Sequence, residues 1–229
     1  GNPTIVYQMG KVGSLSIFNS LKSSGIKPLF HTHFLNFDHR VRVVRRLYHH
    51  VFILSVPTKI ITLAREPFSR NESGFFERLR RIKPGEKIEH FTVEQLIDIF
   101  FNKYFHQEAL AWFDVELNRV TGFDVYDHEL IDNEYLKATK SNFDILVLKS
   151  ELPNSRKESI IGDFMDIDNF SITNANLTTD KKVANIYEDF KNRIIYDQSF
   201  VNKIVDSKYF RYFYGNEKDR ILSKIKIKS

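Results

Sequence analysis

The sequence predicts an α/β protein in which short buried strands alternate with helices. Three apolar runs rich in β-forming residues, Thr4–Met9, Lys59–Ala64 and Phe143–Leu148, each lead into polar or helical sequence. The last run contains four consecutive aliphatic residues, which is typical of a parallel strand buried on both faces. Strands separated by helical stretches favour three layers, with helices on both sides of a mainly parallel central sheet.

The other elements follow from local signals along the chain. Leu15, Phe18 and Leu21 recur at helical spacing, which predicts a first helix over 14–24, and Gly25 ends it. A short strand is expected over 28–34, and residues 92–95 read as a capping box that starts a helix. Residues 178–180 are expected to cap a helix that includes 183–190. Further helices are expected over 38–50, 69–82, 92–104, 108–120, 155–165, 198–205 and 216–225. The C-terminal half is therefore predicted to be helix-rich.

Length and composition indicate one domain spanning residues 1–229. Hydrophobic residues make up 42% of the chain, with 21 Phe and 10 Tyr, and no Pro/Gly/Ser-rich linker or internal repeat divides it. The absence of cysteine excludes disulfides, thiolate catalysis and cysteine metal sites. No apolar run reaches 18 residues and no signal peptide is visible, so we expect a cytoplasmic protein without a membrane segment in this chain.

The charge distribution favours anionic ligands. The net charge is +5 and the isoelectric point about 9.2, and Arg40, Arg42, Arg45 and Arg46 crowd one segment. Two interpretations of these arginines remain open: a solvated helix face, or a surface that binds an anionic acceptor. Nucleic acid is not an expected partner, because the sequence has no zinc-finger spacing, no RNP-type aromatic motif and no clear helix-turn-helix.

A glycine turn between the first strand and the first helix predicts an anion-binding loop. Glycines let the backbone approach a ligand, and the amide groups of a helix N-terminus favour negative charge. Lys11 adds a full positive charge, and two serines add hydroxyl donors. The Walker A pattern is absent, since no Gly-Lys-Ser/Thr run occurs. The candidate phosphate-binding residues are Gly10, Lys11, Val12, Gly13, Ser14, Leu15 and Ser16.

A second anion motif begins where the strand 59–64 ends. Arg65 emerges at the carboxyl end of this strand, where open α/β sheets bind their ligands. Pro67 suits a first helical turn, and Ser73 lies about two turns on, on roughly the same face as Arg65. A guanidinium and a hydroxyl are thus predicted to converge on one phosphate.

These motifs together resemble a known enzyme family. Lys-x-Gly-Ser-x-Ser after a strand resembles the 5′-phosphosulfate loop of sulfotransferases that use 3′-phosphoadenosine 5′-phosphosulfate (PAPS), and Arg-x-Pro-x-x-Arg-x-x-Ser resembles their 3′-phosphate motif. Between them, His31-x-His33 followed by an apolar run resembles the heparan sulfate and uronyl 2-O-sulfotransferase group. Patchier similarity continues in Trp112-Phe113-Asp114 and Phe143–Glu151, as in bacterial relatives that modify capsular polysaccharide. The resemblance covers roughly residues 4–80 and implies the P-loop-like sulfotransferase fold.

The resemblance also implies an activity and residue roles. The sulfuryl group of PAPS would pass to a hydroxyl of a carbohydrate acceptor, such as an anionic polysaccharide. His33 would be the general base with His31 beside it, and Lys11 would stabilise the leaving group. Lys181 and Lys182 lie in a late polar loop of the kind that closes over the nucleotide in the family. No metal is part of this scheme, and two histidines without nearby carboxylates predict none.

Two other functions remain open at this stage. A nucleotide-dependent kinase or NTPase on a related P-loop fold would need a Walker lysine and an acidic Mg²⁺ ligand at a strand end, where this chain has Arg65. A non-enzymatic basic module that binds an anionic polymer would use only arginine-rich segments such as residues 40–46. It would have no need of two ordered anion motifs.

Overall fold

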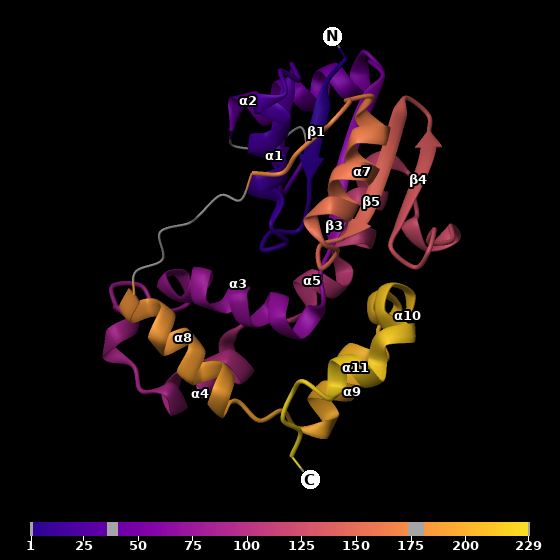
Figure 1. Ribbon diagram of the computed structural model, residues 1–229. Coiled ribbons are helices and arrows are strands. Elements are labelled where there is room, and N and C mark those ends of the chain that lie inside the picture. The colour runs from indigo at the N-terminus through magenta and orange to yellow at the C-terminus, as the bar shows by residue number, and fades with distance from the viewer. Residues whose placement is uncertain (1, 36–40, 174–180, 229) are drawn as a thin grey trace. The chain divides into compact units, whose positions relative to one another are not determined.

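The computed structural model describes residues 2–35, 41–173 and 181–228, except for the side chains of Arg80, Lys181 and Lys182 (Figure 1). Contacts within the chain divide it into two compact units. Unit 1 comprises residues 1–65 and 111–175, and unit 2 comprises residues 66–110 and 176–229. Each chain segment that leaves unit 1 therefore contributes helices to unit 2.

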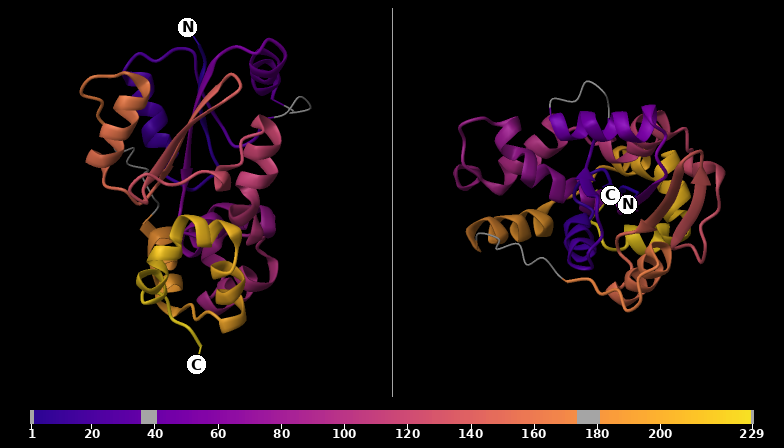
Figure 2. Two further views of the ribbon diagram at one scale, coloured as in Figure 1. Left: turned by 90° about the vertical axis from the view of Figure 1, so that its right-hand side faces the viewer. Right: turned by 90° about the horizontal axis from the view of Figure 1, so that it is seen from above.

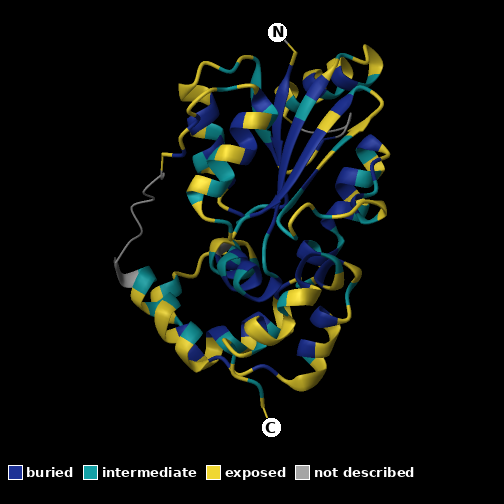
Figure 3. Cartoon of the chain, turned by 45° about the vertical axis from the view of Figure 1, so that its right-hand side comes forward, coloured by how far each residue is buried: buried dark blue, intermediate teal, exposed yellow. Residues whose placement is uncertain are grey.

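Unit 1 is built on a five-stranded sheet in the order β2-β1-β3-β5-β4. Neighbours among the first four strands run parallel, and β4 is antiparallel to β5. The central strands are buried along most of their length because they are continuous aliphatic runs, as Figure 3 shows. The strands are β1 (Thr4–Tyr7), β2 (Leu29–Thr32), β3 (Thr58–Ala64), β4 (Tyr135–Lys140) and β5 (Phe143–Lys149).

Helices cover both faces of this sheet (Figure 2). One face carries α1 (Ser14–Ser23) and α7 (Asn154–Met165). The other carries α2 (Arg42–Tyr48) with the π-helical turn η1 (His49–Ile53), and the π-helical turn η3 (Phe113–Asn118) with α6 (Arg119–Thr121). The predicted α/β class with a mainly parallel sheet is therefore confirmed.

The edge strand β4 was not predicted from the sequence. Of its residues only Leu136 is buried, and Lys137, Thr139 and Lys140 are exposed, so it lacks the continuous apolar run that marks β3 and β5. Its hairpin turn contains Ser141 at φ +53° instead of a glycine, and lysines on an edge strand discourage pairing with another chain.

Several helix boundaries differ from the predicted ones. The helix expected over 38–50 begins at Arg42 and continues into η1, while residues 36–40 lie outside the described residues. The segment expected as one helix over 108–120 consists of α5 (Gln107–Trp112), η3 and α6. Near the C-terminus, α10 (Lys208–Tyr214) was missed because it is nearly continuous aromatic sequence without helical alternation, and α11 (Lys218–Leu222) is shorter than expected.

Unit 2 is a set of helices around an aromatic core. Phe75, Phe100 and Phe190 contact one another at ring-centroid distances of 5.4 to 5.8 Å. The predicted capping box is confirmed, because the Thr92 hydroxyl accepts from the Gln95 amide at 3.3 Å and Gln95 Oε1 accepts from the Thr92 amide at 2.9 Å. Besides α10 and α11, its helices are α3 (Pro67–Ile82), α4 (Val93–Lys103), α8 (Lys181–Arg193) and α9 (Gln198–Val205).

Charged groups inside unit 2 are paired with one another. The side chain of Arg70 is 1% exposed, and its Nη1 donates to the hydroxyl of Tyr104 at 3.2 Å, while its Nη2 lies 3.7 Å from Glu108. Glu108 also binds Arg78, and this bond raises the pKa of Arg78. Buried ions are tolerated only when neighbouring groups satisfy them, so this cluster reads as an internal brace.

No helix among the described residues is both long and apolar enough to cross a membrane.

Candidate functional site

The loop between β1 and α1 has the backbone geometry of an anion cradle. Three of its four residues are left-handed, with φ values of +84° at Gly10, +60° at Lys11 and +75° at Gly13. Gly13 is the N-cap of the ten-residue helix α1, no side chain caps that helix, and its first turn has no acidic residue. A Cβ added to Gly13 would meet nothing within 4 Å. The N-terminus of α1 therefore presents its positive dipole end without a carboxylate to neutralise it.

The side chains of the loop take different positions. Val12 is in the core at 2% exposure, so this residue offers a ligand only its backbone. Lys11 and Ser16 are half-buried, Ser14 is buried, and Leu15 is exposed. Because non-glycine residues pay about 1–2 kcal/mol for the left-handed conformation, Lys11 is held there by its surroundings.

Gln8 joins this loop to the histidines, and the sequence interpretation had missed it. It follows β1, is 1% exposed, and its Oε1 accepts the amide of Gly10. Its backbone carbonyl lies 2.9 Å from Nδ1 of His33, and its Nε2 lies 3.4 Å from Nε2 of His31. A polar residue inside an apolar run, two positions before a glycine turn, was the signal available in the sequence.

The contact with the Gln8 carbonyl assigns the tautomer of His33. A carbonyl oxygen only accepts, so we assign the neutral ring the tautomer in which Nδ1 carries the proton and Nε2 the lone pair. The side-chain nitrogen Nε2 of Gln8 also lies 2.9 Å from Nδ1 of His33, but in this tautomer both atoms are donors and do not bond to each other. The His33 side chain is exposed, and the carbonyl of His33 accepts from Trp112 Nε1 at 3.2 Å. The geometry thus leaves Nε2 able to accept a proton.

His31 lies deeper than His33 and makes different contacts. Its Nε2 is 2.9 Å from the Ser14 hydroxyl, and its ring meets the His33 ring edge to face at 5.5 Å. Burial lowers the pKa of His31, and the neighbouring His33 lowers it further. A neutral His31 accepts a hydrogen bond from Ser14 in the first turn of α1. The strand expected over 28–34 ends at Thr32, so His33 stands just beyond β2 rather than within it.

Arg65 reaches the same loop from the next strand. It follows Ala64, the last residue of β3, and its Nη1 donates to the carbonyl of Lys11 at 2.5 Å. This charge-assisted bond braces the loop in its left-handed conformation. Unit 1 therefore brings together the Gly10–Ser16 loop, His31, His33 and Arg65.

The other predicted phosphate ligands lie in unit 2. Ser73 is half-buried in the second turn of α3, as its spacing from Pro67 predicts. Lys181 and Lys182 begin α8, and their side chains are outside the described residues. The N-terminus of α3 already has an acceptor, because the carboxylate of Glu66 accepts from the amides of Phe68 and Ser69 at 2.6 and 3.0 Å.

A buried carboxylate in η3 fixes the chain just after His33. Glu116 is 6% exposed and accepts from the Tyr7 hydroxyl at 2.6 Å and from the Leu35 amide at 2.8 Å. Burial raises the pKa of Tyr7 strongly, and the negative charge of Glu116 adds to the shift. The segment that carries His33 is thus held at two places: Trp112 donates to the carbonyl of His33, and Glu116 accepts from the amide of Leu35. A glutamate on the apolar side of an amphipathic segment was the signal for this role.

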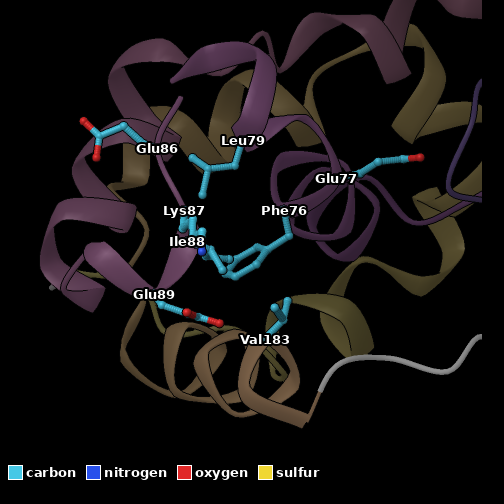
Figure 4. A pocket seen from close by; sticks show the side chains of 8 residues that line it. All are labelled: Phe76, Glu77, Leu79, Glu86, Lys87, Ile88, Glu89 and Val183. Carbon is cyan, nitrogen blue, oxygen red and sulfur yellow. The ribbon is translucent and has the colours of Figure 1, made fainter. Parts of the chain in front are cut away.

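A cavity in unit 2 has a different character (Figure 4). It measures about 480 Å³, and Phe76 projects from α3 toward Ile88 and Val183 across it. Three glutamates and one lysine complete its lining. This apolar, acidic lining does not suit a nucleotide phosphate. The lining residues are Phe76, Glu77, Leu79, Glu86, Lys87, Ile88, Glu89 and Val183.

Comparison with known families places the chain. Residues 86–215 match the NKWYS family, described as "Putative capsular polysaccharide synthesis protein", over more than half of the chain. The chain belongs to this family. None of the curated proteins compared with it matches. Membership links the chain to capsular polysaccharide synthesis and to carbohydrate as a substrate class. The matched region includes Trp112 and Glu116, which hold the His33 segment, whereas the glycine loop and His33 precede it.

Proposed function

We propose that this chain is a PAPS-dependent sulfotransferase that acts on a carbohydrate hydroxyl in capsular polysaccharide synthesis. The observation that carries the proposal is the connection through Gln8 between the anion loop and His33. The glycine loop and the His33 ring lie at the same end of β1 and β2, which supports a phosphate-binding loop beside a proton acceptor. The specific P-loop-like sulfotransferase fold and a carbohydrate acceptor belong to the same proposal.

The loop would hold the nucleotide. PAPS supplies the sulfuryl group and leaves as the 3′,5′-bisphosphate. Backbone amides of residues 13–16 would bind the 5′-phosphate, as amides at a helix N-terminus bind anions. Lys11 would stabilise the charge that develops on the bridging oxygen, and Arg65 would bind the 3′-phosphate.

His33 would act on the acceptor. As the acceptor oxygen bonds to sulfur and the bond from sulfur to the bridging oxygen breaks, Nε2 of His33 takes the hydroxyl proton. The bond from Nδ1 to the Gln8 carbonyl orients the ring and, in the neutral imidazole, places the lone pair on Nε2. The same carbonyl stabilises the imidazolium that forms. His31, kept neutral by burial, would hold Ser14 and the start of α1 in place.

Calorimetry with three ligands tests the nucleotide part of this proposal. We expect adenosine 3′,5′-bisphosphate to bind without Mg²⁺ and more tightly than ATP with Mg²⁺ or a heparin-like polymer. Preference for ATP with Mg²⁺ would favour a kinase or NTPase. Binding of the polymer alone would favour a non-enzymatic basic module.

Product formation tests the reaction itself. Radiolabelled sulfate should pass from PAPS to a capsular polysaccharide in the presence of EDTA, because no residue role here requires a metal ion. The variant His33→Ala serves as the matched control, since it removes the base and leaves the loop intact. Transfer at the wild-type rate by this variant would contradict the proposed mechanism.

A further inference from the structure

The outer surface of α2 and η1 combines exposed aliphatic side chains with positive charge. Four large hydrophobic residues in this stretch are more than half exposed: Val41 at 52%, Val43 at 56%, Ile53 at 62% and Leu54 at 55%. Among the described residues, ten large hydrophobic side chains are at least 40% exposed, and these four fall within 14 consecutive positions. We call residues 41–54 the α2–η1 surface. Exposed apolar residues this close together in the sequence, interspersed with exposed arginines, fit an interaction site.

The charges of this surface are all positive. Arg42, Arg45 and Arg46 are exposed, as are His49 and His50. The sequence contains no Asp or Glu between Asp38 and Glu66. Within the described part of the chain, no ion pair includes any of the three arginines.

The inner side of the same segment is anchored to unit 1. Leu47 is 4% exposed and Val51 is fully buried. Asn142 Nδ2 donates to the Val51 carbonyl at 3.0 Å, and the Phe52 ring packs against Phe143 at 5.4 Å. Because these contacts fix the segment, its exposed aliphatic residues stay outside the core when the chain is folded.

We propose that the α2–η1 surface binds the surface of an anionic lipid bilayer. Aliphatic side chains beside arginines suit the interface of such a bilayer. The aliphatic side chains enter the acyl region, and the arginines bind lipid phosphates. A second copy of the chain fits less well, since it would bring two sets of arginines together. A polysaccharide would use the arginines but would leave Ile53 and Leu54 in water. The proposal does not depend on the sulfotransferase activity.

Vesicle sedimentation tests this directly with the full chain. We expect binding to vesicles of 70% phosphatidylcholine and 30% phosphatidylglycerol, and little binding to phosphatidylcholine alone. The triple change Arg42→Gln, Arg45→Gln, Arg46→Gln should weaken binding roughly 100-fold, since each arginine near an anionic surface contributes about fivefold. The double change Ile53→Ser, Leu54→Ser should weaken binding at low and high salt alike, because salt screens only the charges.

Matched controls change the same residue types elsewhere. Phe105→Ser with Ile195→Ser replaces two exposed hydrophobic residues, and Lys22→Gln with Lys103→Gln and Lys203→Gln removes three exposed charges. Both controls should bind vesicles like the wild type, and thermal unfolding should show that all variants fold. Equal losses in the controls, or equal binding to neutral and anionic vesicles, would overturn the proposal. Loss of a dimer in the Ile53→Ser, Leu54→Ser variant, or a raised KM for acceptor with unchanged vesicle binding in the arginine variant, would assign the surface to another partner.

Discussion

The two strand-to-helix junctions that follow β1 and β3 solve the same problem in opposite ways. Each leaves the amides of a first helical turn without partners inside the helix. At the start of α3, Glu66 accepts from two of these amides, and Pro67 occupies the first helical position. At the start of α1, Gly13 has no side chain and none caps the helix. The junction after β1 leaves the first amides of α1 without a side-chain cap, while the junction after β3 satisfies two amides of α3 with the carboxylate of Glu66.

This difference separates function from stability. At the junction after β1, the left-handed backbone, Lys11 and the Gln8 link to His33 would all serve the anion of the proposed function. At the junction after β3, the helix end is occupied by Glu66, so only the Arg65 side chain would meet a ligand in the proposed function. Changes at the first junction should therefore alter binding and turnover, and changes at the second should alter folding or the reading of the 3′-phosphate.

The largest effect is expected from His33→Ala. Loss of the general base should lower kcat roughly 10²–10⁴-fold and leave nucleotide affinity nearly unchanged. The wild-type rate should fall on acidification because a proton then occupies Nε2, and the variant should lose this dependence. Steady-state kinetics over a range of pH measure both. His90→Ala, at an exposed histidine of unit 2, is the control, and a large loss in His31→Ala alone would exchange the two roles.

Lys11→Ala should have the next largest effect after His33→Ala. We expect kcat to fall about 10²–10³-fold, which is the scale for removing one donor that stabilises developing charge. Its interaction grows as the bridging bond breaks, so kcat should fall more than nucleotide affinity. Lys22→Ala, at the exposed end of α1, controls for the change in net charge. A loss confined to affinity would make Lys11 a phosphate anchor.

Arg65 distinguishes a phosphate ligand from a structural brace. If it reads the 3′-phosphate, adenosine 3′,5′-bisphosphate should bind about 10–150-fold more tightly than 5′-AMP, which is the effect of 1.5–3 kcal/mol for a charged hydrogen bond. Arg65→Ala should abolish this preference in calorimetry. If the variant weakens both ligands equally, Arg65 acts only through its bond to the Lys11 carbonyl.

Gln8→Ala should have a smaller effect, confined to the loop. The backbone carbonyl that binds His33 remains, and the side-chain acceptor for the Gly10 amide is lost. One lost hydrogen bond predicts about three- to tenfold weaker nucleotide binding. The pH dependence of kcat should persist, since the His33 tautomer is set by the carbonyl. Disappearance of that dependence would show that the side chain, rather than the carbonyl, sets it.

The smallest effects compare the junctions directly. Glu66→Ala removes a helix cap and should lower the free energy of unfolding by about 0.5–2 kcal/mol without changing binding of 5′-AMP. Gly13→Ala should lower the free energy of unfolding by about 1–2 kcal/mol, because φ +75° disfavours a side chain. It should also weaken the binding of 5′-AMP. Chemical denaturation and calorimetry measure both quantities. Equal effects of the two variants on nucleotide binding would remove the distinction between the junctions.

Local patterns in the sequence determined the elements that depend on neighbouring residues. The aliphatic runs of β3 and β5, the helix that begins at Ser14 and the capping box at Thr92 each follow from residues a few positions apart. The glycine loop belongs to the same class, because left-handed backbone at Gly10 and Gly13 is a local property. The roles given to its residues stay predictions.

Only the tertiary structure decided which distant groups meet. Gln8 bonds to His33 across 25 residues, Arg65 to Lys11 across 54, and Tyr7 to Glu116 across 109. No periodicity encodes such pairs, since they arise from the parallel order of β2, β1 and β3 and from the packing of η3 on the sheet. For the same reason, β4 became recognisable only beside β5, because a strand without a continuous apolar run becomes stable when a neighbour supplies its hydrogen bonds.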